Sequence, residues 1–136
     1  MKAGFLQPLL AKGGSHRLEN LRSGVVVVET LTAAVDSSSR RKGLLGHTSM
    51  PAGSGLVIAP SNAVHTFFMK FPIDVVFLSK TGHVLKIRPA VPAWRMAASL
   101  LAFAVLEMPA GSIERSDLKV GDQVVLRAAA QEDSRA

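Results

Sequence analysis

The chain has 136 residues, 48% of them hydrophobic and 19% charged, which is the composition of a globular protein with one core. Its net charge of +6 is spread thinly, and with 5% aromatic residues it lacks the clustered basic and aromatic side chains of a nucleic-acid binder. The absence of Cys excludes disulfides, a thiolate nucleophile and Cys-ligated zinc or iron–sulfur sites.

Residues 1–24 contain scattered Gly and Pro without a sustained hydrophobic period, and we predict that they form a flexible leader. Gln7 and Pro8 interrupt the early apolar residues, so the segment does not read as a secretory signal. No apolar run in the chain approaches the roughly 18 residues that cross a bilayer. We therefore expect a soluble, cytoplasmic protein without a transmembrane segment.

A single β-rich domain is predicted over residues 25–127, followed by a disordered tail at 128–136. The β-branched run that starts at Val25 indicates a first strand over 25–35, and Asp36 begins a short helix that Gly46 ends. A turn of helix is also predicted near 112–118. Further strands are predicted at 55–59, 64–70, 73–78, 83–88, 102–108 and 122–127. Many short strands separated by turn residues favour a mainly β fold, a compact antiparallel β-sandwich or barrel-like domain with one or two short helices.

The segment 65–88 is predicted to form three consecutive antiparallel strands. Its alternation places Asp74 with Val76 and Leu78 on an apolar side that faces the core. In this register Met69 lies opposite Asp74, and His65 is roughly 13 Å further along its strand. A catalytic dyad of His65 and Asp74 is therefore not favoured.

A carboxylate on the core side needs a cation or several hydrogen-bond donors to compensate for its lost hydration. For Asp74 we expect an arginine from a distant segment, with Arg40, Arg41 and Arg95 as candidates, and a role in ligand binding or catalysis as the alternative. Glu107 lies on the apolar side of its strand and presents the same choice, unless the strand is an exposed edge. His65, among Phe and Met residues, is either a hydrogen-bonded core residue or a ligand or general base.

Common catalytic motifs are absent: the sequence has no GxxxxGK[ST], GxGxxG, HExxH or GxSxG pattern. His65, Asp74 and Glu107 would suit a hard or borderline metal ion, but four His residues without paired spacing do not predict a metal site. No cofactor is implied.

Several sequence blocks resemble the bacterial and archaeal family called domain of unknown function 192. They are Arg40–Gly46, Gly55–Ile58, Asn62–Leu78 with its His-Thr-Phe-x-Met-Lys-x-Pro-Ile-Asp core, Val105–Gly111 and Gly121-Asp122. The resemblance covers most of residues 25–127 and implies a small, mainly β fold with no established activity or cofactor. It marks as motif positions, without roles, Arg40, His65, Met69, Asp74, Glu107, Gly111 and Asp122. Members often carry Cys where this chain has Ser61, and Gly-Leu-Met-Gly where it has Gly-Leu-Leu-Gly, so chemistry that depends on that Cys is not expected here.

The sequence favours a binding module for a small molecule, since apolar and ionisable residues share one predicted face. The predicted ligand-binding residues are Arg40, His65, Met69, Asp74, Trp94, Arg95 and Glu107. One alternative is a hydrolase or metal-assisted enzyme in which Asp74 or Glu107 is the general base and His65 lies nearby. Another is a structural or protein-interaction domain whose polar core residues are all satisfied internally. No nucleic-acid partner is expected, and the oligomeric state is left open.

Overall fold

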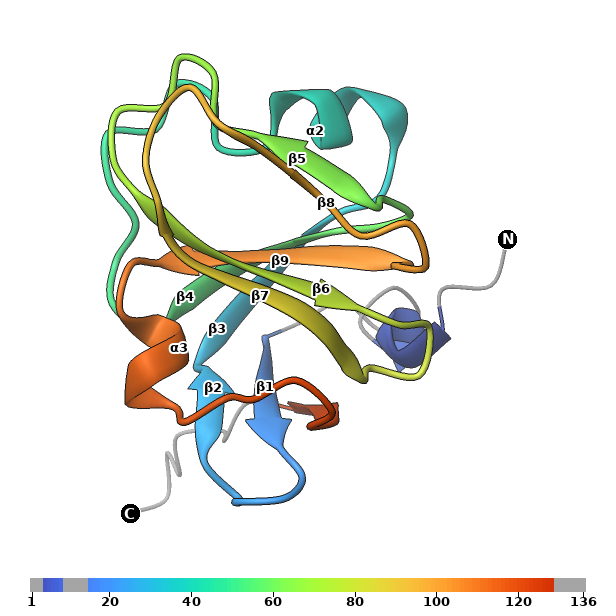
Figure 1. Ribbon diagram of the computed structural model, residues 1–136. Helices are drawn as coiled ribbons and strands as arrows, with labels where there is room; N and C mark the ends of the chain where they lie inside the picture. Colours follow the sequence, from blue (N-terminus) through green and yellow to red (C-terminus); the bar gives the residue numbers. More distant parts are fainter. Residues whose placement is uncertain (1–3, 9–14, 129–136) are drawn as a thin grey trace, which may run out of the picture.

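The computed structural model describes residues 4–8 and 15–128 (Figure 1). A short 3-10 helix, η1 (Gly4–Leu6), precedes the strands. In the described residues the strands are β1 (His16–Asn20), β2 (Val26–Val28), β3 (Thr30–Ala34), β4 (Ser54–Ile58), β5 (Ala63–His65), β6 (Ile73–Leu78), β7 (Val84–Val91), β8 (Met96–Ala98), β9 (Ala104–Pro109) and β10 (Val124–Ala128). The α-helices that lie wholly within the described residues are α2 (Ser37–Lys42) and α3 (Ser112–Arg115).

A five-stranded sheet in the order β3-β4-β9-β6-β7 forms the middle of the molecule. Strands β3 and β4 are parallel, and the other neighbours are antiparallel. Every residue of β6 is buried, as are all of β9 except Pro109. Near-continuous apolar runs are typical of strands covered on both faces, so β6 and β9 occupy the interior of the sheet.

Two covering layers enclose this sheet (Figure 1). On one face the three-stranded sheet β10-β1-β2 contributes Leu18 and Val124 to a core that includes Val76 and Leu106. On the other face lie α2 and the two-stranded sheet β5-β8, with a second core around Phe77. The mainly β prediction is confirmed, and no sheet in the described residues closes into a barrel.

The predicted run of three consecutive antiparallel strands is confirmed for its second pair, because β6 and β7 are antiparallel neighbours, and wrong for its first pair. Strand β5 pairs with β8, not with β6, and β9 lies beside β6 so that Asp74 is opposite Met108. Strand β9 can be buried on both faces because it is apolar almost throughout, whereas β5 has exposed residues. The buried Thr66 holds β5 to the chain after β7, because its hydroxyl donates to the Pro92 carbonyl at 2.6 Å.

Part of the predicted flexible leader, residues 1–24, forms strand β1. It pairs with β10 and β2, and it buries His16, Leu18 and Asn20 on alternate positions. The period of two is present, but polar side chains occupy two of the three inward positions, so the hydrophobic pattern did not reveal it. Leu6 of η1 is also buried in the core. Residues 1–3, 9–14 and 129–136, which belong to the predicted leader and tail, lie outside the described residues.

Helix α2 starts as predicted, because the Asp36 side chain accepts a hydrogen bond from the Ser39 N–H at 2.8 Å and caps the first turn. It ends at Gly43, which has a φ of +46°, three residues before the predicted stop at Gly46. The described residues include no helix that is both long enough and apolar enough to cross a membrane.

Candidate functional site

Asp74 is fully buried, as predicted, but its partners differ from the prediction. One carboxylate oxygen accepts from the Ala90 N–H and the other from the Ile113 N–H, both at 2.8 Å. No ion pair to Asp74 is formed by the side chains that the structure describes, which include Arg40 and Arg95 but not Arg41. The expected pairing is therefore wrong for Arg40 and Arg95, because two backbone amides compensate the charge of Asp74 instead.

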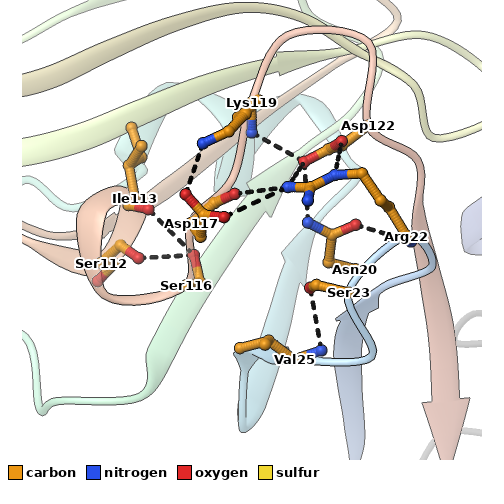
Figure 2. A network of polar contacts seen from close by, with 10 residues as sticks. All are labelled: Asn20, Arg22, Ser23, Val25, Ser112, Ile113, Ser116, Asp117, Lys119 and Asp122. Carbon is orange, nitrogen blue, oxygen red and sulfur yellow. Dashed lines mark hydrogen bonds and ion pairs between the residues drawn. The ribbon is translucent and has the colours of Figure 1, made fainter.

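The acid that a distant arginine does compensate is Asp122 (Figure 2). Its oxygens accept from the Arg22 guanidinium at 2.7 and 3.1 Å, from Asn20 at 2.9 Å and from the Lys119 N–H at 2.9 Å. The hydrogen bond from Arg22 is the main reason that the pKa of the Asp122 carboxyl lies well below its usual range. Arg22 also donates to the Asp117 carbonyl, so the network joins the β1–β2 turn to the loop before β10.

Asp74 and Glu107 lie on opposite faces of the central sheet. Asp74 is opposite Met108, whereas Glu107 is opposite Val75 on β6 and Leu56 on β4. Directly opposed residues share a face and successive residues alternate, so the two carboxylates point away from each other. Asp74 and Glu107 therefore do not face a common cleft.

A pocket of about 640 Å³ lies on the Glu107 side of the sheet, between α2 and β5. Four of the predicted ligand-binding residues line it: Arg40, His65, Met69 and Glu107. Lining residues that were not predicted to bind a ligand include Lys42, Gly43 and Ser61. Asp74, Trp94 and Arg95 are outside this lining.

Glu107 is 3% exposed, and its Oε1 atom has no hydrogen-bond partner among the residues that the structure describes. Burial raises the pKa of the carboxyl to about 7, so at neutral pH the neutral and anionic forms are both populated. No described cation lies within 4.0 Å of its oxygens. Gly43 comes close above it: a Cβ atom there would lie 3.8 Å from Glu107 Oε1. The carboxyl can therefore accept a hydrogen bond or exchange a proton within the pocket.

The opposite side of the pocket carries hydrogen-bond donors. Arg40 is half-buried, and its guanidinium donates one hydrogen bond to the Val35 carbonyl at 3.0 Å. Lys42 is exposed. The Nδ1 atom of His65 accepts from the Phe67 N–H at 3.3 Å. In the neutral ring the proton is then on Nε2, so His65 also offers a donor.

Trp94 and Arg95 lie on the loop between β7 and β8. The Trp94 ring stacks on Phe67 with a centroid distance of 5.6 Å, and Phe67 contacts His65 at 5.0 Å. Phe67 thus lies between Trp94 and His65, a residue of the pocket lining, and the part of Trp94 in ligand binding stays a prediction, as does that of Arg95. Among the described residues, no group of three or more His, Asp or Glu side chains could hold a metal ion.

The fold and site define a small, mainly β domain whose pocket lies between a central sheet and a cover made of one helix and a two-stranded sheet. The chain belongs to the domain of unknown function 192 family, described as "Uncharacterized ACR", whose model matches residues 19–126. This confirms the resemblance to that family.

Two solved structures are similar to the chain at 22% sequence identity, a level that shows the fold alone. One is a "putative transcription regulator" from Sinorhizobium meliloti 1021, with a TM-score of 0.71 over 84% of this chain and 96% of that one. The other is a protein of unknown function from Novosphingobium aromaticivorans DSM 12444, with a TM-score of 0.68 over 84% of this chain and 87% of that one. Comparison with curated proteins finds no match.

Proposed function

We propose that this domain binds a small polar molecule in the pocket between α2 and β5, with Glu107 as the buried recognition group. The observation that carries the proposal is the unpartnered Oε1 atom of Glu107 at a pocket wall. A buried polar atom without a partner costs about 1–3 kcal/mol, and more when it is charged. A ligand that donates a hydrogen bond there would remove this cost.

The remaining buried acids of the described residues support this interpretation. Asp74 has a donor for each oxygen, and Asp122 has four hydrogen bonds. Glu107 is therefore an exception within a chain that otherwise satisfies its buried carboxylates. A volume of about 640 Å³ also falls within the range of small-molecule sites, roughly 300–1,000 Å³. A purely structural role for Glu107 would leave the unpaired oxygen and the space beside it unexplained.

A fragment screen by ligand-observed NMR tests the proposal with three variants. Glu107→Gln keeps one acceptor but loses the charge, Glu107→Met removes both oxygens at similar volume, and Glu114→Gln removes an exposed acid on α3 as the control. We expect fragments that bind the wild type and the control, bind Glu107→Gln more weakly, and no longer bind Glu107→Met. In spectra of the labelled protein, the amide shifts that change on binding should belong to residues 37–45 and 58–65, which include much of the pocket lining. Fragments that bind all three variants equally would contradict the proposal.

A second candidate function is acid–base catalysis in the same pocket. It is favoured by one observation, the pKa of about 7 for Glu107 in a pocket that His65 also lines. The purified protein would be assayed on a panel of p-nitrophenyl esters and phosphates. A rate that inflects near pH 7 and disappears in Glu107→Gln supports catalysis, whereas no turnover, or a rate unchanged by the substitution, contradicts it.

A further inference from the structure

We infer that the ligand of this pocket is a small zwitterion, with its amino group at Glu107 and its anionic group at Arg40 and Lys42. The inference rests on the proposed function of the pocket and specifies the class of ligand. It follows from how donors, acceptors and charges are distributed over the lining.

The charged groups of the pocket are divided by position. Glu107, in the central sheet, is the acid of the lining. Arg40 and Lys42 come from α2, and His65, from β5, adds a donor. A ligand that matches all of them presents a donor to the sheet and an acceptor to the cover.

The acid and the cations do not neutralise each other. No described cation lies within 4.0 Å of the Glu107 oxygens, and burial alone accounts for the raised pKa of this carboxyl. Ion pairing with Arg40 or Lys42 would have lowered that pKa. The opposite charges thus share a pocket while remaining apart, and a molecule placed between them can pair with both.

The sequence segment that supplies most of the pocket lining is basic overall, and its charge favours an anionic group on the ligand. Between residues 37 and 106 the chain has a single acid, Asp74, which is buried and hydrogen-bonded. The same segment carries eight basic residues: Arg40, Arg41, Lys42, Lys70, Lys80, Lys86, Arg88 and Arg95. The positive potential of this segment repels a simple cation and attracts an anion. A plain amine therefore lacks half of the recognition that the pocket offers.

A single introduced thiol can report on occupancy, because the chain contains no Cys. Ser61 lines the pocket, and Ser61→Cys places the thiol in its wall. Ser79→Cys, on the turn between β6 and β7, is the control outside the pocket. The rate of alkylation by iodoacetamide, a neutral reagent, would be measured for both variants with 4-aminobutanoate, butanoate or butylammonium at equal concentration. Longer and shorter ω-amino acids then test which separation of the two charges fits between Glu107 and the cations of α2.

The zwitterion is expected to slow alkylation of Ser61→Cys several-fold, with an optimum chain length, and to leave Ser79→Cys unchanged. Butanoate and butylammonium should have little effect, and adding Glu107→Met or Lys42→Gln should abolish or weaken the protection. Protection by butanoate or butylammonium equal to that of every ω-amino acid would overturn the zwitterion inference. So would an absence of protection by the ω-amino acids when the screen finds fragments that depend on Glu107. In both cases the proposed binding function would still stand, since it fails only if no fragment depends on Glu107.

Discussion

Asp74 and Glu107 lie on neighbouring strands of one sheet and are both shielded from water, yet their surroundings differ completely. Asp74 faces the layer formed by β1, β2 and β10, and backbone N–H groups satisfy both of its oxygens. Glu107 faces the layer formed by α2 and β5, beside a pocket, and its Oε1 atom has no hydrogen-bond partner in the described part of the chain. Burial alone therefore does not separate a structural acid from a site residue, whereas the hydrogen-bond count does.

The two carboxylates indicate that one face of the sheet contributes to stability and the other to binding. On the Asp74 side, the carboxylate ties β6 to the ends of β7 and β9, since Ala90 belongs to β7 and Ile113 lies in α3, shortly after β9. On the Glu107 side, the Oε1 atom contributes no hydrogen bond that the structure describes. We expect substitutions on the first face to lower stability and substitutions on the second to change binding.

Asp74→Ala should give the largest effect. It leaves the Ala90 and Ile113 amides buried without an acceptor, and each unpaired donor costs roughly 1–3 kcal/mol, so we expect a loss of about 4 kcal/mol of unfolding free energy. Urea denaturation followed by circular dichroism measures it. A loss below about 1 kcal/mol would show that water reaches these amides, and the contrast with Glu107 would no longer hold.

Glu107→Gln should act in the opposite direction, and its effect should depend on pH. The pKa of the carboxyl rises from 4.5 to about 7 on burial, so the folded state holds a proton that the unfolded state releases. The wild type therefore loses stability as pH increases from about 4.5 to 7, by about 3 kcal/mol in total. The variant lacks this loss, so the difference between variant and wild type should shift in favour of the variant by that amount over the same pH range. An equal pH dependence in the two proteins would contradict the unpaired state of Glu107.

Asp122→Asn tests an acid held by a side-chain cation instead of backbone amides. We expect a loss of about 2 kcal/mol at neutral pH, because the neutral amide of the variant cannot accept the same charge-assisted hydrogen bonds. The folded-state pKa of Asp122 is depressed, so its contribution is present at neutral pH and should decline as pH falls below about 4. Arg22→Met should cost less, since that side chain is 47% exposed. Thermal unfolding at about pH 7 and about pH 3 checks this account, and a difference independent of pH would contradict it.

Arg40→Gln and Lys42→Gln should have the smallest effects on stability. Arg40 makes one hydrogen bond to Val35, worth about 1 kcal/mol, whereas Lys42 is exposed and its replacement should change stability by less than about 0.5 kcal/mol. Both variants should nevertheless weaken the binding of anionic fragments in the NMR titration. A larger loss of stability without a change in binding would place these residues with Asp74 among the structural ones.

Much of the fold could be predicted from the sequence because its signals are local. Short β-branched and apolar runs located most strands, and Asp36 marked the start of α2. The polar residues of β1 concealed its strand, because a hydrophobic pattern cannot report a position where His or Asn is buried. The alternation of side chains also showed that Asp74 is buried, while the family motif, without assigning a role, included Glu107.

What the sequence by itself determined is thus the mainly β class and the residues that share each face of a strand. Only the tertiary structure decided which strands are neighbours, and with them the partners of each carboxylate. Strand β9 lies between β4 and β6 because long-range packing selects it. Every residue except proline offers a backbone N–H, so the donors to Asp74 have no signature in the sequence. The same is true of the missing partner of Glu107, since an unfilled space beside a side chain exists only once the distant segments around it have packed.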